Sequence, residues 1–220
     1  EVLKKLNRIG FNMMGDMNWH AHCGIFTYPI KIAVMISAKL NKGQLLIADP
    51  LILGDASFAR AVILLTAHNK EGSVGFILNK PLQYSITDLL PEIDTPFKVY
   101  NGGPVEQDNL YFIHDVPHLI PNSVEISNGI YWGGCFESVK ELINQQKIGK
   151  NNIRFFLGYT GWDENQLESE MEQNSWIATS NTHENKIISK STTHFWKEKI
   201  IELGGDYLIW SNAPDDPYLN

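Results

Sequence analysis

The sequence is poor in cysteine and contains no long apolar run. Its 220 residues include two cysteines, Cys23 and Cys135, which lie far apart in the chain. Two such residues provide no disulfide framework, so a reducing cytoplasm is the expected compartment. No stretch approaches the roughly 18 apolar residues of a membrane span, and the short run Ile30–Ile36 contains Lys31 and lacks a signal-peptide layout. We therefore expect a cytoplasmic protein that makes no membrane contact.

Positive charge is also scarce. The chain has 18 Lys and Arg against 25 Asp and Glu, which gives a net charge of −7 and a pI near 5.5. Nucleic-acid affinity depends on clustered Lys and Arg. The helix expected from Asp163 is strongly acidic, and no helix-turn-helix pattern is present. Direct contact with nucleic acid is therefore not expected.

The first 34 residues differ from the rest of the chain. They begin with Glu1 and show no strand or helix pattern, whereas Met35 leads directly into a strong strand. We expect residues 1–34 to be an extension, not native or poorly ordered, and residues 35–220 to form a single domain. Intact-mass measurement of protein from the native locus tests whether Met35 is the natural start. Within the extension, His20–Cys23 offers imidazole and thiolate groups, but no second ligand pair has zinc spacing, so no metal site is expected.

One stretch, residues 153–163, organises the expected fold. Apolar and aromatic side chains occupy both faces of an extended segment, which is typical of a strand inside a sheet. Arg154 is the exception, and we expect it either to pair with a carboxylate or to point outward at a sheet end. Gly158 and Gly161 are expected to form a tight turn, followed by a helix whose capping box pairs Thr160 with Asp163. The acidic first turn and the absence of a following Lys argue against a phosphate loop, so we expect these glycines to serve close packing.

Further strands and helices alternate along the chain. The sequence predicts strands over residues 44–50, 61–68, 74–79, 97–100, 110–114, 131–132 and 175–178. It predicts helices over residues 86–90, 136–146 and 195–203. Residues 69–72 have hairpin composition, so the two strands that they join should be antiparallel. We expect an α+β fold with a mixed, largely antiparallel sheet and helices packed on it.

Five segments in order resemble the YqgE/AlgH family of bacterial proteins: residues 43–50, 75–81, 101–105, 131–134 and 154–162. The resemblance runs from Gly43 to Asn220 and implies a compact fold with two intimately joined lobes. One branch of the family carries the label of transcriptional regulator. The resemblance implies no catalytic residue, cofactor or metal. Cys135 departs from the family pattern, in which a polar residue commonly follows the glycine pair.

Reactive groups are present, but no motif joins them. Cys135 with His68, His114 or His118 offers a nucleophile and a base, although no nucleophile elbow is present. His114, Asp115 and His118 have a spacing that a helix would make suitable for metal binding, but Pro117 breaks a helix there. We therefore predict no catalytic residue, no cofactor and no metal.

The remaining polar and aromatic groups define a candidate surface for a protein or small-molecule partner. Its members are Arg60, His68, Asn79, Tyr131, Trp132, Arg154, Tyr159 and Trp162. The polar members either line a cleft or join loops to the sheet, and the aromatic members either contact a partner or fill the core. The leading hypothesis is a non-enzymatic binding or regulatory protein. The alternative is a hydrolase-like enzyme with a cleft around Arg60, His68 and Arg154.

Overall fold

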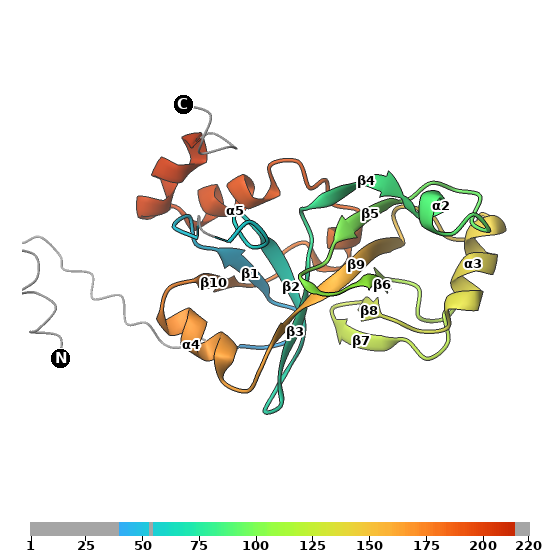
Figure 1. Cartoon of the computed structure of the whole chain (residues 1–220), viewed down its shortest axis with the longest axis horizontal. Coiled ribbons are helices and arrows are strands. Elements are labelled where there is room, and N and C mark those ends of the chain that lie inside the picture. Colours follow the sequence, from blue (N-terminus) through green and yellow to red (C-terminus); the bar gives the residue numbers. More distant parts are fainter. Residues whose placement is uncertain (1–39, 53–54, 214–220) are drawn as a thin grey trace, which may run out of the picture. The chain divides into compact units, whose positions relative to one another are not determined.

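The computed structural model describes residues 40–52 and 55–213 (Figure 1). The strands are β1 Leu45–Ala48, β2 Val62–Asn69, β3 Gly72–Ile77, β4 Pro81–Ser85, β5 Lys98–Asn101, β6 Val105–His114, β7 Val124–Ser127, β8 Ile130–Trp132, β9 Ile153–Trp162 and β10 Trp176–Thr179. The helices are α2 Ile86–Leu89, α3 Phe136–Asn144, α4 Gln166–Glu172 and α5 Phe195–Leu203, with 3₁₀ helices η2 Glu184–Ile188 and η3 Gly205–Asn212. The predicted extension and its His20–Cys23 group lie outside the described residues, so the division at residue 35 stays a prediction.

The strands form a mixed, largely antiparallel sheet, which confirms the predicted α+β class. Its main path runs β10-β1-β2-β3-β9-β6-β8-β7, and every pairing on it is antiparallel. β5 pairs with β9 in parallel, and β4 pairs with β5. The predicted hairpin is present, with Lys70 and Glu71 between β2 and β3. β4 and β7 were not predicted from the sequence.

The predicted glycine turn is wrong, because β9 continues through both glycines. Thr160 lies within the strand and donates a hydrogen bond to the main-chain oxygen of Gly75 instead of capping a helix. α4 begins only at Gln166. Gly158 has φ +69°, and a Cβ there would lie 2.6 Å from the Gly103 oxygen. Gly158 thus permits close packing, as predicted, but its neighbour is the chain entering β6 and not a following helix. At this place β6 departs from regular pairing with β9.

β9 joins two apolar cores through neighbouring phenylalanines on opposite faces. Phe156 belongs to the core that β1, β2 and β3 form with α5, and it stacks on Phe76 with ring centroids 4.8 Å apart. Phe155 belongs to the core that includes β5 and side chains of α2 and α3. A third cluster, containing Trp162, lies beside α4. Both ends of β9 are therefore fixed by packing, which positions the residues at its start.

No helix in residues 40–52 and 55–213 is long and apolar enough to span a membrane.

Candidate functional site

A pocket of about 240 Å³ lies where the start of β9 meets β5 and the segment between η2 and α5. In Figure 1 these elements are the labelled β5 and β9 and the chain that enters α5. We call it the Arg154 pocket. Its lining residues are Phe97, Lys98, Tyr100, Lys150, Asn151, Ile153, Arg154, Ile188, Ser189, Lys190, Ser191, Thr192 and Thr193.

Arg154 is a buried cation at the floor of this pocket, with 5% of its surface exposed. Its Nη1 donates to the main-chain oxygen of Leu78 at 3.2 Å, and its Nη2 donates to that of Lys190 at 2.6 Å. Its guanidinium carbon lies 4.8 Å from the centre of the Tyr100 ring. The sequence predicted a carboxylate partner or an outward orientation, and both alternatives are wrong. Two carbonyls accept hydrogen bonds from the group and a ring lies against it, but among the described residues no carboxylate matches its positive charge.

Burial lowers the pKa of the Arg154 guanidinium, because a charged group loses solvation when it leaves water. The nearby Tyr100 acts in the opposite direction. Arginine nevertheless stays protonated in proteins at neutral pH. The pocket floor therefore carries a full positive charge in surroundings of low polarity.

Three lysines also line the pocket, and two of them add to this charge. Lys98 and Lys150 are exposed at the pocket rim, and among the described residues neither has a carboxylate within ion-pair distance. Lys190 instead pairs with Glu198 on α5 at 2.6 Å. The described residues that line the pocket include no Asp, Glu, His or Cys. The pocket is thus positively charged in a protein whose net charge is negative.

Hydroxyl groups of the segment between η2 and α5 form one wall of the pocket. Ser189 donates to the main-chain oxygen of Lys186. Ser191, Thr192 and Thr193 make no side-chain hydrogen bond within residues 40–52 and 55–213. Hydroxyls without an internal partner can donate to an anion or exchange hydrogen bonds with a polar ligand.

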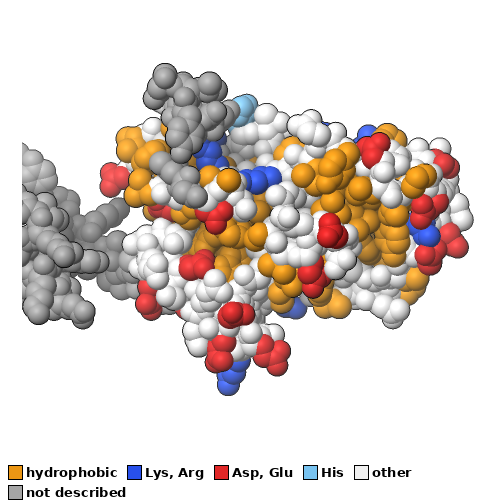
Figure 2. Space-filling model, viewed as in Figure 1, with side chains coloured by type: hydrophobic (Ala, Val, Ile, Leu, Met, Phe, Trp, Pro, Cys, Tyr) orange, Lys and Arg blue, Asp and Glu red, His pale blue; other side chains and the backbone are white. Residues whose placement is uncertain are grey.

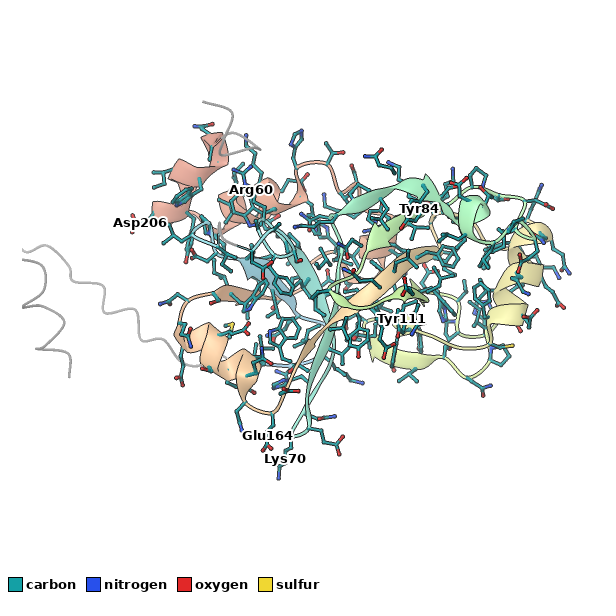
Figure 3. The ribbon with its side chains drawn as sticks, in the orientation of Figure 1. Arg60, Lys70, Tyr84, Tyr111, Glu164 and Asp206 are labelled. Atoms are coloured by element: carbon teal, nitrogen blue, oxygen red, sulfur yellow. The ribbon has the colours of Figure 1, made fainter. Side chains whose placement is uncertain are left out.

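The predicted cleft around Arg60, His68 and Arg154 is not assembled. Arg60 precedes β2 and lies over the Trp196 ring at 5.2 Å. His68 lies near the other end of β2, six residues beyond Val62, which is about 20 Å along a strand. Figure 3 shows Arg60 beside α5 and Lys70 at the distant hairpin tip, close in sequence to His68. His68 contacts Ser73 at 2.8 Å.

Asn79 joins a loop to the sheet, as one of the two sequence-based alternatives proposed. Its Oδ1 accepts from the Val62 main-chain N–H at 2.8 Å, and its Nδ2 donates to the Arg60 oxygen at 2.8 Å. Both polar ends of the amide are therefore occupied by main-chain groups.

The four aromatic members of the predicted surface lie on strands, not on turns. Trp162 is buried and donates to Glu170 at 2.9 Å, so it belongs to the core beside α4. Tyr159 is half-buried against Tyr111. Trp132 and Tyr131 are half-buried on β8, where Tyr131 stacks on His114. Of the four, only Trp162 is fully withdrawn from contact with a partner.

Among the described residues, no hydrogen bond or ion pair joins the candidate nucleophile Cys135 to a histidine. Cys135 precedes α3, and hydrogen bonds from the Ser138 side chain and main chain lower the pKa of its thiol. His114 is fully buried, with Nδ1 accepting from the Val116 N–H and Nε2 facing the Gly133 oxygen. Both nitrogens of that imidazole are therefore engaged by main-chain groups. Within the described ranges, no group of three or more His, Cys, Asp and Glu is arranged to hold a metal.

Sequence reasoning identified Arg154 but missed the rest of the pocket. Lys98, Lys150 and Lys190 come from three separate segments, so no spacing along the chain connects them. The available signal was the hydroxyl-rich run Ser189–Thr193 directly before a predicted helix.

Comparison with known proteins gives a consistent family. The family model described as AlgH-like (DUF179) matches residues 45–208. A UPF0301 protein of Cytophaga hutchinsonii is 42% identical over 183 residues, covering 82% of this chain and 100% of that protein. A UPF0301 protein of Chlorobium limicola is 39% identical over 185 residues, covering 83% and 97%.

Two solved structures share the fold. The solution structure of the AlgH protein from Pseudomonas aeruginosa has a TM-score of 0.62 at 23% identity, covering 80% of this chain and 95% of that one. A crystal structure of a Corynebacterium diphtheriae protein has a TM-score of 0.63 at 20% identity, covering 79% and 92%.

Proposed function

This chain belongs to the AlgH-like family, and we propose that it is a non-enzymatic binding protein that holds an anionic small molecule in the Arg154 pocket. The observation that carries the proposal is the buried Arg154 guanidinium, which has no carboxylate partner among the described residues. An unneutralised buried charge costs several kcal/mol of solvation. An anion in the adjoining pocket would offset that cost and would gain charge-assisted hydrogen bonds.

The unused donors of Arg154 support this role. A guanidinium has five N–H groups, and hydrogen bonds to Leu78 and Lys190 each use one of them. These two bonds also hold the side chain in one orientation. A fixed cation binds an anion at a smaller entropic cost than a flexible one.

The side chains that line the pocket favour binding over catalysis. General acid–base chemistry needs a titratable group close to the reacting atoms. Among the described lining residues, the titratable side chains are lysines, Tyr100 and Arg154. Tyr100 is 8% exposed and lies beneath the guanidinium, and Lys190 is held by Glu198. These residues bind and orient an anion, but they do not include a carboxylate or imidazole base.

A regulatory role would then operate through the ligand and a protein partner, without direct DNA contact. On the face shown in Figure 2, Lys and Arg are scattered among more numerous Asp and Glu, and acidic side chains gather around the β2–β3 hairpin. A small pocket suits a metabolite-sized anion better than a nucleic-acid backbone, which requires an extended positive surface.

Isothermal titration calorimetry with inorganic phosphate and sulfate tests the proposal. The wild type should bind, and Arg154→Met should weaken binding by about tenfold or more, since each charge-assisted contact is worth on the order of 1.5–3 kcal/mol. Lys150→Met removes an exposed cation and should also weaken binding while leaving the fold intact. Lys70→Met, at the hairpin tip (Figure 3), changes the net charge equally and should bind like the wild type.

Two results contradict the proposal. One is that the wild type binds no anion. The other is that Lys70→Met and Lys150→Met weaken binding to the same extent, because this would indicate a general charge effect.

A further inference from the structure

We propose that the occupant of the Arg154 pocket is a small phosphorylated sugar or polyol, an inference that rests on the proposed function. Lys98, Lys150 and Arg154 have no carboxylate partner among the described residues. A phosphate monoester carries a charge of about −1.5 to −2 at pH 7 and presents three acceptor oxygens. A single carboxylate has one charge and two oxygens. Three cations around one small pocket therefore match a phosphate better than a carboxylate.

The rings of the pocket are not available for stacking. The Arg154 guanidinium already covers one face of the Tyr100 ring, and the residue as a whole is 8% exposed. Phe97 is 2% exposed and packs edge-on against Phe155, with ring centroids 5.5 Å apart. A nucleobase gains its affinity largely by stacking on aromatic faces. The pocket therefore disfavours a nucleotide relative to a ligand without a base.

The two isoleucines of the lining are equally inaccessible. Ile153 is 2% exposed and Ile188 is 1% exposed, because both belong to the two cores. These two isoleucines therefore offer little surface to a hydrophobic ligand body. A polar ligand body loses no contact with them.

Polar partners for such a body lie on the wall formed by the segment between η2 and α5. The hydroxyls of Ser191, Thr192 and Thr193 are uncommitted within the described residues, and Asn151 adds an amide to the pocket lining. Each of these groups both donates and accepts, as the hydroxyls of a sugar or polyol do. The volume of about 240 Å³ lies below the usual 300–1,000 Å³ range for drug-sized ligands, which favours a compact molecule.

A calorimetric panel separates this inference from the proposed function. The probes are ribose 5-phosphate, ribose, inorganic phosphate, AMP and citrate. Ribose 5-phosphate should bind about tenfold more tightly than inorganic phosphate, since hydroxyl contacts together worth ~1.4 kcal/mol give that factor. Ribose alone should not bind measurably, and AMP should bind no more tightly than ribose 5-phosphate.

A variant of the hydroxyl wall and a matched control outside the pocket test this contact. Thr192→Val should weaken the binding of ribose 5-phosphate by a larger factor than the binding of inorganic phosphate. Ser180→Ala removes an exposed hydroxyl just beyond β10, away from the pocket lining, and should change neither affinity.

The outcomes are distinguishable. AMP or citrate binding more tightly than ribose 5-phosphate, with Lys150→Met weakening that binding, would overturn the sugar-phosphate inference. The anion-binding function would then remain intact. Equal binding of inorganic phosphate and ribose 5-phosphate would also overturn the inference alone. Failure of every anion in the panel to bind would overturn both.

Discussion

The Arg154 guanidinium donates a 2.6 Å hydrogen bond to the main-chain oxygen of Lys190, which is 36 residues away in the sequence. This bond ties the start of β9 to the segment between η2 and α5. The same guanidinium reaches Leu78, so one side chain connects three parts of the chain. The wall and floor of the pocket are therefore held together by the residue that provides its central charge.

Arg154→Lys tests this connection. Lysine keeps the charge but lacks the planar fork that reaches two carbonyls. We expect a loss of about 1–2 kcal/mol in the free energy of unfolding, because at least one buried carbonyl loses its donor. Urea denaturation measures the loss. Lys150→Arg at the exposed rim is the control, and an equal loss in both variants would contradict a special role for the fork.

The pH dependence of stability should reflect His114. Burial lowers the pKa of this imidazole, while the Gly133 oxygen and Asp115 act in the opposite direction. Protonation also removes the acceptor for the Val116 N–H. Below the unfolded pKa near 6.5, the unfolded chain binds a proton that the folded chain does not, so stability falls as pH decreases from about 6.5 toward the lower folded pKa.

Urea midpoints at pH 7.5 and pH 5.5 measure this effect. His114→Asn should show a smaller decrease between the two pH values than the wild type. Some decrease should remain, because burial and two nearby lysines lower the pKa of His183 as well. His118→Asn, the same substitution at an exposed histidine, is the control for the change of residue type. An unchanged decrease in His114→Asn would refute the assignment.

Gly158 should tolerate no side chain. An alanine Cβ would lie 2.6 Å from the Gly103 oxygen and 2.7 Å from the Val105 oxygen, at a φ of +69°. Both contacts are with main-chain atoms, so Gly158→Ala should cost roughly 3 kcal/mol of unfolding free energy. Gly149→Ala has open space and no positive φ, and it should change stability by less than about 1 kcal/mol. Thermal or urea unfolding that ranks the two variants equally would contradict the packing argument.

Glu170 should stabilise the protein by accepting from two tryptophans. Its Oε2 receives the indole N–H of Trp162 at 2.9 Å and that of Trp176 at 2.7 Å. Glu170→Ala leaves two donors of buried residues unpaired and should cost about 2 kcal/mol, whereas Glu170→Gln keeps an acceptor and should cost less. Glu172→Ala, on the exposed part of α4, is the control for lost charge. Equal stability of the Ala and Gln variants would argue against the hydrogen bonds.

The sequence predicted local structure better than the site. Alternation and apolar runs located most strands, and residues 69–72 identified the hairpin, because these signals are local. The turn at Gly158 and Gly161 was mispredicted because a glycine required for close approach looks the same in sequence as one required for a turn. Only the contact of Gly158 with the chain before β6 distinguishes the two.

The site depends on contacts between distant segments. Arg154 was recognisable as a cation among apolar residues, but its partner Lys190 contributes a main-chain oxygen, which no side-chain pattern reports. Arg60 and His68 lie near opposite ends of β2, so the length of this strand keeps them apart. Their residue types alone gave no sign of this separation. A charged pocket in an acidic protein is hidden by the overall composition.

Amide chemical-shift mapping during titration with inorganic phosphate tests the central claim most directly. The anion-binding account predicts saturable shifts confined to residues 98–100, 150–154 and 188–193, which are strongly reduced in Lys150→Met and retained in Lys70→Met. Shifts that are absent, or that spread over lysines elsewhere without saturating, would contradict it.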